Sequence, residues 1–310
     1  MTQTKKRVLF VSSEMSPFLE TSPLATVARM LPQALQEQEN EIRILVPRFG
    51  VINERRNRLH EVVRLSGINI SIDDNDNPLI IKVASIPQTK MQVYFLDNED
   101  YFHRKALFHD ESGKLFDDND ERTIFFCKGV METVKKLGWA PDIIHCQGWM
   151  TSLIPMYLKT LYKDEPVFKH TKVVFSVHCD EGKINLGGDF ARKASLNSLD
   201  DDCMKCFGDA SVDAMNIGAV KHSDAIVTNS EEAHRVVEAH LSDKIVMRHS
   251  DEDAATQYGS LYERDSVIVF EGVGSAPSDS VNYFIDHRTG TQTYWVNSII
   301  VPLGLSFSIP

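Results

Sequence analysis

The sequence predicts an α/β fold with a doubly wound, mostly parallel sheet. Short runs rich in Val and Ile alternate with segments of helical periodicity over about the first 240 residues. The strand-like runs are continuously apolar, which is typical of parallel strands covered by helices on both faces. In such sheets ligands bind beyond the carboxyl ends of the strands.

The first half of the chain begins with a strand, a helix and a second strand. The strands are expected at residues 7–11 and 41–47, and apolar residues at helical spacing predict a helix over 24–36. A meander follows, with turns expected at 73–78 and 87–90. Its three β-prone runs are 61–72, 79–86 and 91–96.

The second half continues the alternation. A long helix is expected over 119–137, with Gly138 ending it. Ser230 is the expected N-cap of a later helix. The later strands are expected at 142–145, 172–177 and 225–228, and the later helices at 151–161, 212–222 and 230–240. The segments that follow strands, where a site is expected, are 12–23, 47–56, 146–150, 178–188 and 229–231.

The alternation stops near Ser250. Three β-prone runs follow with no helical partner, at 266–270, 283–285 and 293–302. We therefore expect two parts, a domain over 1–249 and an atypical extension over 250–310. The extension is open to three interpretations: a strand pair on the domain surface, a disordered segment, or a segment foreign to the ancestral fold.

Composition narrows the function classes. The chain has 310 residues, is 42% hydrophobic and carries a formal net charge of −11. A net negative charge disfavours nucleic-acid binding. No apolar run reaches the roughly 18 residues of a membrane span, and the first apolar run is too short for a signal peptide. A cytoplasmic protein with no membrane and no nucleic-acid partner is expected.

The five cysteines predict neither a disulfide framework nor a metal site. An odd count with uneven spacing favours reduced thiols. Cys203 and Cys206 have CxxC spacing, but no second pair of ligands follows at the usual distance for zinc. The acidic runs lack the EF-hand spacing of a calcium loop. We expect no metal and no cofactor.

Five segments in order resemble one family. They are RVLFVSSEMSPFLETSPLATV from Arg7, VYFLDNEDYFHRKALF from Val93, the long segment from Asp118 to Lys159 that contains HCQGWM, VVFSVHCDEGKI from Val173, and KHSDAIVTNSEEAHRVV from Lys221. Together they resemble the N-terminal domain of the bacterial glycogen synthase and plant starch synthase family. The resemblance implies the N-terminal Rossmann-like half of a two-domain GT-B glycosyltransferase that transfers glucose from ADP-glucose to an α-1,4-glucan.

The departures from the family pattern concern phosphate binding. Glu20 stands where the family's glycine loop has Lys, Ser22 and Pro23 replace its two glycines, and Thr26 replaces its Asp. Gly148 stands where the His-Asp-Trp turn has its carboxylate. Glycines let backbone N–H groups approach a phosphate, whereas proline has no N–H group and a glutamate repels phosphate. The C-terminal donor-binding domain of the family is also not recognisable after about Ser250.

The resemblance gives a set of candidate site residues. His178 is the candidate catalytic residue because it matches the family histidine that contacts the sugar. The expected substrate-binding residues are Ser12, Glu14, Glu20, His145, Trp149 and His178. A structural role is the alternative for each: the histidines pack at strand ends, Trp149 anchors the core, and the two glutamates are solvated rather than an acid/base pair.

Two functions remain open. The first is a glucosyltransferase of this family, with weak or no activity alone or with a second chain completing the cleft. The second is a non-catalytic domain that binds a glucan, ADP-glucose or a protein partner. A dehydrogenase-like nucleotide binder is excluded, because no glycine occurs between Val11 and Gly50 and so no GxGxxG motif follows the first strand.

Overall fold

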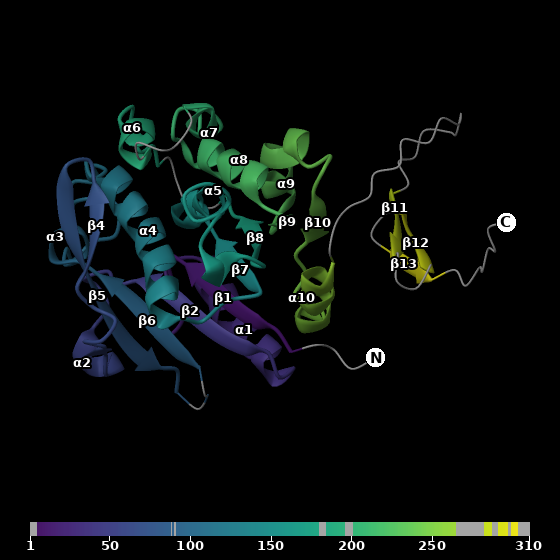
Figure 1. Cartoon of the computed structure of the whole chain (residues 1–310), viewed down its shortest axis with the longest axis horizontal. Helices are drawn as coiled ribbons and strands as arrows, with labels where there is room; N and C mark the ends of the chain where they lie inside the picture. Colours follow the sequence, from purple (N-terminus) through teal and green to yellow (C-terminus); the bar gives the residue numbers. More distant parts are fainter. Residues whose placement is uncertain are drawn as a thin grey trace. The chain divides into compact units, whose positions relative to one another are not determined.

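A computed structural model gives the structure of the chain (Figure 1). It describes residues 5–87, 89, 91–179, 184–195, 201–264, 282–286, 291–296 and 299–302. The chain divides into two compact units, Met1–Arg264 and Asp265–Pro310.

The first unit is built on a ten-stranded sheet with the strand order β10-β9-β8-β7-β1-β2-β6-β5-β3, while β4 pairs with β5 outside this path. The parallel strands are β1 (Arg7–Ser12), β2 (Glu41–Pro47), β6 (Gln92–Asp97), β7 (Ile143–Gln147), β8 (Lys172–Val177), β9 (Ala225–Thr228) and β10 (Ile245–Arg248). The antiparallel strands are β3 (His60–Glu61), β4 (Ile68–Ile72) and β5 (Asn75–Ser85). The predicted doubly wound, mostly parallel sheet is confirmed.

Helices cover both faces of this sheet. On one face α1 packs beside α10, and on the other α5 packs beside both α4 and α8. The helices are α1 (Pro23–Glu37), α2 (Glu54–Asn57), α3 (Glu99–Phe102), α4 (Asn119–Leu137), α5 (Leu153–Lys159), α6 (Phe190–Ala194), α7 (Asp201–Lys205), α8 (Val212–His222), α9 (Glu231–Val237) and α10 (Ala254–Glu263). Short 3₁₀ turns occur at Trp149–Thr151, Pro166–Phe168 and Glu238–His240.

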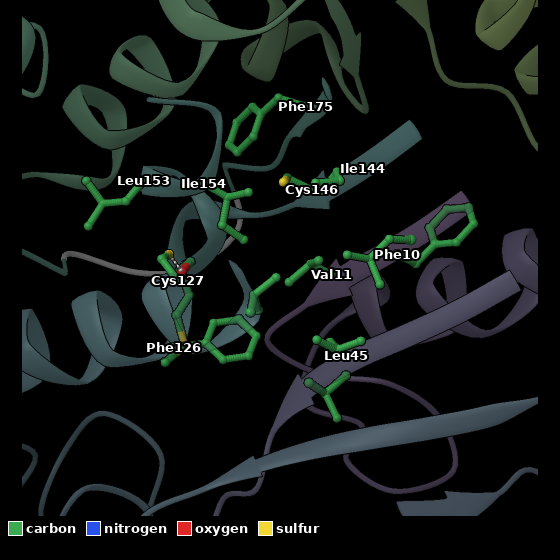
Figure 2. Close-up of a cluster of buried hydrophobic side chains, with 14 of the residues drawn as sticks. Phe10, Val11, Leu45, Phe126, Cys127, Ile144, Cys146, Leu153, Ile154 and Phe175 are labelled. Carbon is green, nitrogen blue, oxygen red and sulfur yellow. Dashed lines mark hydrogen bonds between the residues drawn. The ribbon is translucent and has the colours of Figure 1, made fainter. Parts of the chain in front are cut away.

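The core lies between the sheet and the helices α4 and α5. Buried side chains of β1, β2, β7 and β8 meet those of the two helices there (Figure 2). The labelled members are Val11, Leu45, Phe126, Cys127, Ile144, Cys146, Leu153, Ile154 and Phe175. Phe10, which is also labelled, lies on the opposite face of the sheet, where its ring packs against His145 at 5.1 Å between centroids. The thiol of Cys127 donates a hydrogen bond to the Met150 carbonyl at 3.2 Å, which joins α4 to the turn after β7.

The local sequence explains where the helices begin and end. Ser22, Ser211 and Ser230 cap α1, α8 and α9 by accepting hydrogen bonds from backbone N–H groups of the first turn. Gly138 ends α4 in the left-handed conformation with φ 61°. The predicted bounds of β2, α4, β8, α8 and β9 are confirmed residue for residue.

One predicted turn is shorter than expected. Residues 75–78, assigned to a turn in the sequence analysis, begin β5 and pair with residues 69–72 of β4. The reversal needs only Asp73 and Asp74, because Asp73 adopts the left-handed conformation with φ 50°. Short polar side chains such as Asp tolerate that conformation, so the run of Asp and Asn is a tight hairpin.

The C-terminal part also differs from the expectation. The first unit continues to Arg264, past the expected boundary at 249/250, because β10 pairs with β9 and α10 packs on α1. The helix α10 was not predicted. In the second unit β11 (Asn282–Asp286), β12 (Thr291–Val296) and β13 (Ile299–Pro302) form an antiparallel sheet. The β-prone run at 283–285 is therefore a strand, and the run at 293–302 contains parts of two strands. The run at 266–270 lies outside the described residues.

None of the helices in the described part of the chain combines the length and the apolar composition that crossing a membrane requires.

Candidate functional site

The carboxyl ends of β1, β2, β7, β8 and β9 lie at one edge of the sheet, because these neighbouring strands are parallel. The predicted site residues lie in the last residues of these strands or in the loops that follow them. Ser12 is the last residue of β1 and Glu14 follows it, while His178 follows β8. A ligand site at this edge is what the strand order favours.

Glu14 is the centre of the loop between β1 and α1. Its carboxylate accepts hydrogen bonds from the backbone N–H groups of Thr21 at 2.7 Å and Ser22 at 3.2 Å. It also accepts hydrogen bonds from the hydroxyl groups of the same two residues. The side chain is only 4% exposed. These four bonds match the roughly four acceptor sites of a carboxylate, so Glu14 holds the loop rather than serving as a free base.

A cavity of about 280 Å³ opens beside this loop. Its lining comes from the β1–α1 loop, the loop after β2, the segment before α4 and Ile184. Its lining residues are Ser13, Glu14, Leu19, Thr21, Ser22, Phe49, Leu107, Phe108, His109 and Ile184. The volume is near the lower end for small-molecule sites.

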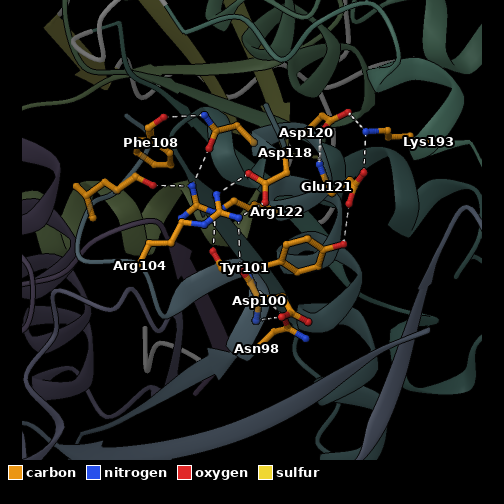
Figure 3. A network of polar contacts seen from close by, with 12 residues as sticks. Asn98, Asp100, Tyr101, Arg104, Phe108, Asp118, Asp120, Glu121, Arg122 and Lys193 are labelled. Carbon is orange, nitrogen blue, oxygen red and sulfur yellow. Dashed lines mark hydrogen bonds and ion pairs between the residues drawn. The ribbon is translucent and has the colours of Figure 1, made fainter. Parts of the chain in front are cut away.

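Ion pairs connect α4 to α6, the helix that follows the lining residue Ile184. Ile184 lies in the segment that leads into α6, and Lys193 of α6 forms ion pairs with Asp120 at 2.8 Å and Glu121 at 2.7 Å. Glu121 also accepts a hydrogen bond from the Tyr101 hydroxyl at 2.9 Å. The start of α4 therefore carries a polar network that ties together α3, α4 and α6 (Figure 3).

Glu20 does not line the cavity. It is exposed, and its carboxylate accepts a hydrogen bond from the Ser16 hydroxyl at 2.6 Å. Pro23 is exposed as well, at the first position of α1. The two glutamates therefore have different environments. The carboxylate of Glu14 accepts the hydrogen bonds of the loop's N–H groups, and this role was not predicted from the sequence.

His145 lies on the α10 side of the sheet and is fully buried. Its Nδ1 is 2.6 Å from the Tyr262 hydroxyl and its Nε2 is 2.7 Å from the Ser176 hydroxyl. The Tyr258 ring stacks on it at 5.5 Å between centroids. His145 is absent from the cavity lining, and the structural alternative describes its contacts better than a sugar contact.

Trp149 is also buried, at the start of the turn after β7. Its ring packs against Phe108 with 5.1 Å between centroids, so it lies behind a residue of the cavity wall. The interpretation of Trp149 as a core anchor fits this placement. Ser12 is likewise fully buried, and its hydroxyl is 3.5 Å from the backbone nitrogen of Glu14.

His178 follows β8 at the ligand edge and is 4% exposed. The side-chain amide of Asn229 lies 2.9 Å from its Nδ1 and 2.5 Å from its Nε2. Asn216 of α8 donates a hydrogen bond to the His178 carbonyl at 3.2 Å. Two asparagines therefore fix the backbone and ring of His178, and its catalytic role stays a prediction.

Several buried polar atoms near the same edge have no hydrogen-bond partner within the described residues. The side-chain oxygens of Asn216 and Asn229 are two of them, and the side-chain nitrogens of both residues contact His178. The others at this edge belong to Gln147, Trp149 and Ser152. Asn216 was not predicted at the site, although a polar residue on the apolar face of a helix is a recognisable signal.

Burial lowers the pKa of His145 and of His178 to about 3. The positive charges of other histidines lower them further: His178 and His249 act on His145, and His249 acts on His178. The ordinary value is 6.5. Between these two values the unfolded chain binds more protons than the folded one, so acid favours unfolding. The two side chains are therefore neutral near pH 7 and become a source of instability as the pH falls below 6.5.

We expect the free energy of unfolding to fall between pH 7 and pH 5.5 by about 1.4 kcal/mol per histidine per pH unit below the ordinary pKa. Urea unfolding at the two pH values measures this change. The variant His178→Gln should show a smaller loss, since one of the two groups is gone. Equal stability of the wild-type chain at both pH values would contradict the expectation.

The basic side chains and the cysteines do not add a site. Arg104 is paired with Asp118 and packs over the Phe116 ring at 4.6 Å. Cys206 lies 3.5 Å from His222 Nε2, and burial raises the pKa of the Cys206 thiol to about 11. Across the described ranges, no group of three or more His, Cys, Asp or Glu side chains is arranged to hold a metal ion.

The chain is similar to proteins of one family. Residues 7–242 match the model of the starch synthase catalytic domain. The chain is 38% identical over 271 residues to a glycogen synthase of Pelodictyon phaeoclathratiforme, covering 86% of this chain and 54% of that protein. It is 42% identical over 234 residues to a glycogen synthase of Chlorobaculum tepidum, covering 74% and 47% respectively. The chain thus spans about half the length of the curated relatives it matches.

A solved structure supports the fold. The catalytic domain of starch synthase IV from Arabidopsis thaliana, described as bound to ADP and acarbose, aligns with a TM-score of 0.63 at 18% identity. The alignment covers 79% of this chain and 52% of that one. The α/β fold, the order of the sequence segments and the match over residues 7–242 lead to one conclusion: the chain belongs to the starch synthase catalytic-domain family of glycosyltransferases.

Proposed function

We propose that the chain binds an α-glucan in the cavity beside the β1–α1 loop and has little or no glucosyltransferase activity alone. The reaction of its family would be transfer of glucose from ADP-glucose to the glucan. The observation that carries the proposal is the Glu14 carboxylate, which already accepts the N–H groups of Thr21 and Ser22.

Those N–H groups are the donors that a diphosphate would use at this loop. They precede the first turn of α1, where the helix dipole adds positive potential. An incoming phosphate would have to displace a buried carboxylate or approach it at close range, and both cost free energy. Pro23 offers no N–H group of its own, and Glu20 adds a second negative charge on the exposed side of the loop.

The lining of the cavity suits a neutral sugar better than an anion. The half-buried side chains of Leu107 and Phe108 offer apolar surface to a pyranose face, while Ser13 and His109 offer polar atoms to its hydroxyl groups. The carboxylate of Glu14 lies in the same wall and repels a phosphate. A short α-glucan segment therefore fits the chemistry of these residues.

A second function rests on the length of the chain. The chain spans about half the length of the curated relatives it matches, and a second chain that corresponds to the other half of those relatives would complete a cleft. The transferase would then be active only in the complex. ADP-glucose would bind mainly through the other chain in that case, and the present cavity would hold the acceptor glucan.

Transfer of radiolabelled glucose from ADP-glucose to glycogen tests the proposal. We expect a turnover more than about tenfold below that of the full-length Chlorobaculum tepidum glycogen synthase measured alongside, which corresponds to at least about 1.4 kcal/mol of lost transition-state stabilisation. A turnover within tenfold would reject it. Adding the separately produced C-terminal half of that relative tests the second function, since restored turnover would favour a two-chain enzyme.

Co-sedimentation with glycogen tests the binding. We expect the wild-type chain to sediment with glycogen and Phe108→Ala to lose most of the bound fraction, because the wall of the cavity is removed. Met30→Ala is the matched control, since Met30 is 60% exposed on α1. Retention of glycogen by Phe108→Ala, or no retention by the wild-type chain, would contradict the glucan-binding proposal.

A further inference from the structure

Arg122 is a buried cation behind the wall of the cavity. It lies in the first turns of α4 and is 1% exposed. Figure 3 shows its guanidinium between α4 and the segment that runs from Tyr101 to Phe108. Arg122 itself does not line the cavity, whereas Leu107 and Phe108 do.

The guanidinium of Arg122 holds that segment at both ends. Its Nε donates to the Tyr101 carbonyl at 2.7 Å and its Nη1 donates to the Leu107 carbonyl at 2.6 Å. Nη1 also donates to Asn119 Oδ1 at 2.7 Å, and Asn119 Nδ2 in turn donates to the Phe108 carbonyl at 2.9 Å. The backbone positions of Leu107 and Phe108 are therefore set from α4.

Aromatic rings surround the same cation. The guanidinium carbon lies 5.5 Å from the centroids of the Phe49 and Phe102 rings and 5.9 Å from that of Phe108. The Phe116 ring is also at 5.5 Å. Such distances are within the range of cation–π attraction. Phe49 and Phe108 are both wall residues, so Arg122 contacts the cavity wall from behind on two sides.

Burying a charged guanidinium at this position costs free energy, so we expect Arg122 to have a role that an apolar side chain could not fill. Arg122 forms no ion pair among the described residues, and its Nη2 has no hydrogen-bond partner there. Burial lowers the pKa of Arg122 to about 10, so it stays charged near pH 7. The charge of Asp118 offsets part of this lowering of the pKa. A buried charge with no carboxylate in direct contact is a weak source of stability compared with an apolar side chain of similar size. Its fixed, planar set of donors is what an apolar side chain does not supply.

We propose that Arg122 is a positioning residue that sets the shape of the glucan cavity by holding Leu107, Phe108 and Phe49 in place. The effect on glucan binding rests on the proposed function. The positioning of the segment does not, because it can be measured in the folded chain without a ligand. Lysine at this position keeps the charge, yet a single ammonium does not reproduce the planar geometry that reaches Tyr101, Leu107 and Asn119 together.

The test compares Arg122→Lys with Arg104→Lys, the same substitution in the same network. Arg104 pairs with Asp118 and its Nη2 donates to the Asp100 carbonyl, but it does not hold Leu107 or Phe108. Two quantities are measured for each variant: amide hydrogen exchange by peptide, and the dissociation constant of maltoheptaose by calorimetry. Global destabilisation raises exchange throughout the chain, whereas loss of positioning raises it locally.

We expect Arg122→Lys to speed amide exchange of residues 102–109 by at least about tenfold, with β1, β7 and β8 unchanged, and to weaken maltoheptaose binding by at least about tenfold. Arg104→Lys should leave both within about twofold. Unchanged local exchange in Arg122→Lys, uniformly raised exchange, or an equal effect in Arg104→Lys would overturn the inference. If the wild-type chain binds no maltoheptaose, the proposed function fails while the exchange pattern still decides the positioning role.

Discussion

The variant Glu14→Ala is expected to lower the free energy of unfolding by about 3 kcal/mol. Four hydrogen bonds end on this carboxylate, and its removal leaves the N–H groups of Thr21 and Ser22 without their acceptor in a half-buried loop. Bonds to a charged acceptor contribute more than neutral ones, and an unpaired donor adds its own desolvation cost. Urea unfolding of both proteins at pH 7 measures the difference.

The control for this prediction is Glu20→Ala. Glu20 is a carboxylate of the same loop, but it is exposed and bonded only to the Ser16 hydroxyl among the described residues. We expect its loss to change the free energy of unfolding by less than about 0.5 kcal/mol. Equal effects of the two substitutions would mean that Glu14 does not organise the loop.

The neutral variant Glu14→Gln tests whether the negative charge of Glu14 weakens phosphate binding, separately from the part of Glu14 in the stability of the loop. It keeps the size of the side chain while removing the charge that faces the loop's N–H groups. We expect inorganic pyrophosphate to bind it at least about tenfold more tightly than the wild-type chain, because a like charge no longer opposes it. Unchanged pyrophosphate affinity would remove the main support for weak transferase activity.

Much of the fold could be predicted because its signals are local. The strands β2, β8 and β9 are apolar runs with clear ends, and α4 has both its periodicity and the glycine that stops it. The helix α10 was missed because its apolar face consists mainly of two tyrosines, Tyr258 and Tyr262, in a polar and acidic context. Its packing depends on α1 and His145, which lie far away in the sequence.

The site was predicted less well because its side chains, like those of α10, are placed by contacts between segments that are far apart in the sequence. Of the segments expected at the ligand edge, 12–23, 47–56 and 178–188 contribute residues to the cavity lining. The wall residues Leu107 and Phe108 come from a segment that was not expected there. His145 was expected at the site because it matches the family pattern, yet alternation along β7 turns it toward the α10 tyrosines. Phe49 and Phe108, which form the wall, carry no signal of their own, since a phenylalanine is most often a core residue. Only the structure shows that they lie beside Glu14.

Replacement of Gly50 is expected to have a large effect, because its lack of a side chain lets the loop after β2 approach the segment that forms the cavity wall. A Cβ built at this position would lie 2.3 Å from the Arg104 carbonyl oxygen and 2.5 Å from that of His103. Both are backbone atoms just before the wall residues Leu107 and Phe108, so relief requires a shift of that segment. We expect Gly50→Ala to lower the free energy of unfolding by about 3 kcal/mol and to abolish co-sedimentation with glycogen.

Two other glycines distinguish a loss of site geometry from a loss of stability. A Cβ at Gly218 would meet the Phe207 ring at 2.3 Å, which is away from the cavity lining, whereas nothing lies within 4 Å of one at Gly188. Gly218→Ala should therefore lower stability by about 1–3 kcal/mol and leave glycogen retention of the folded fraction unchanged, and Gly188→Ala should change neither. If Gly218→Ala lost glycogen binding as completely as Gly50→Ala, binding would follow global stability and the close contact at Gly50 would have no special part in shaping the wall.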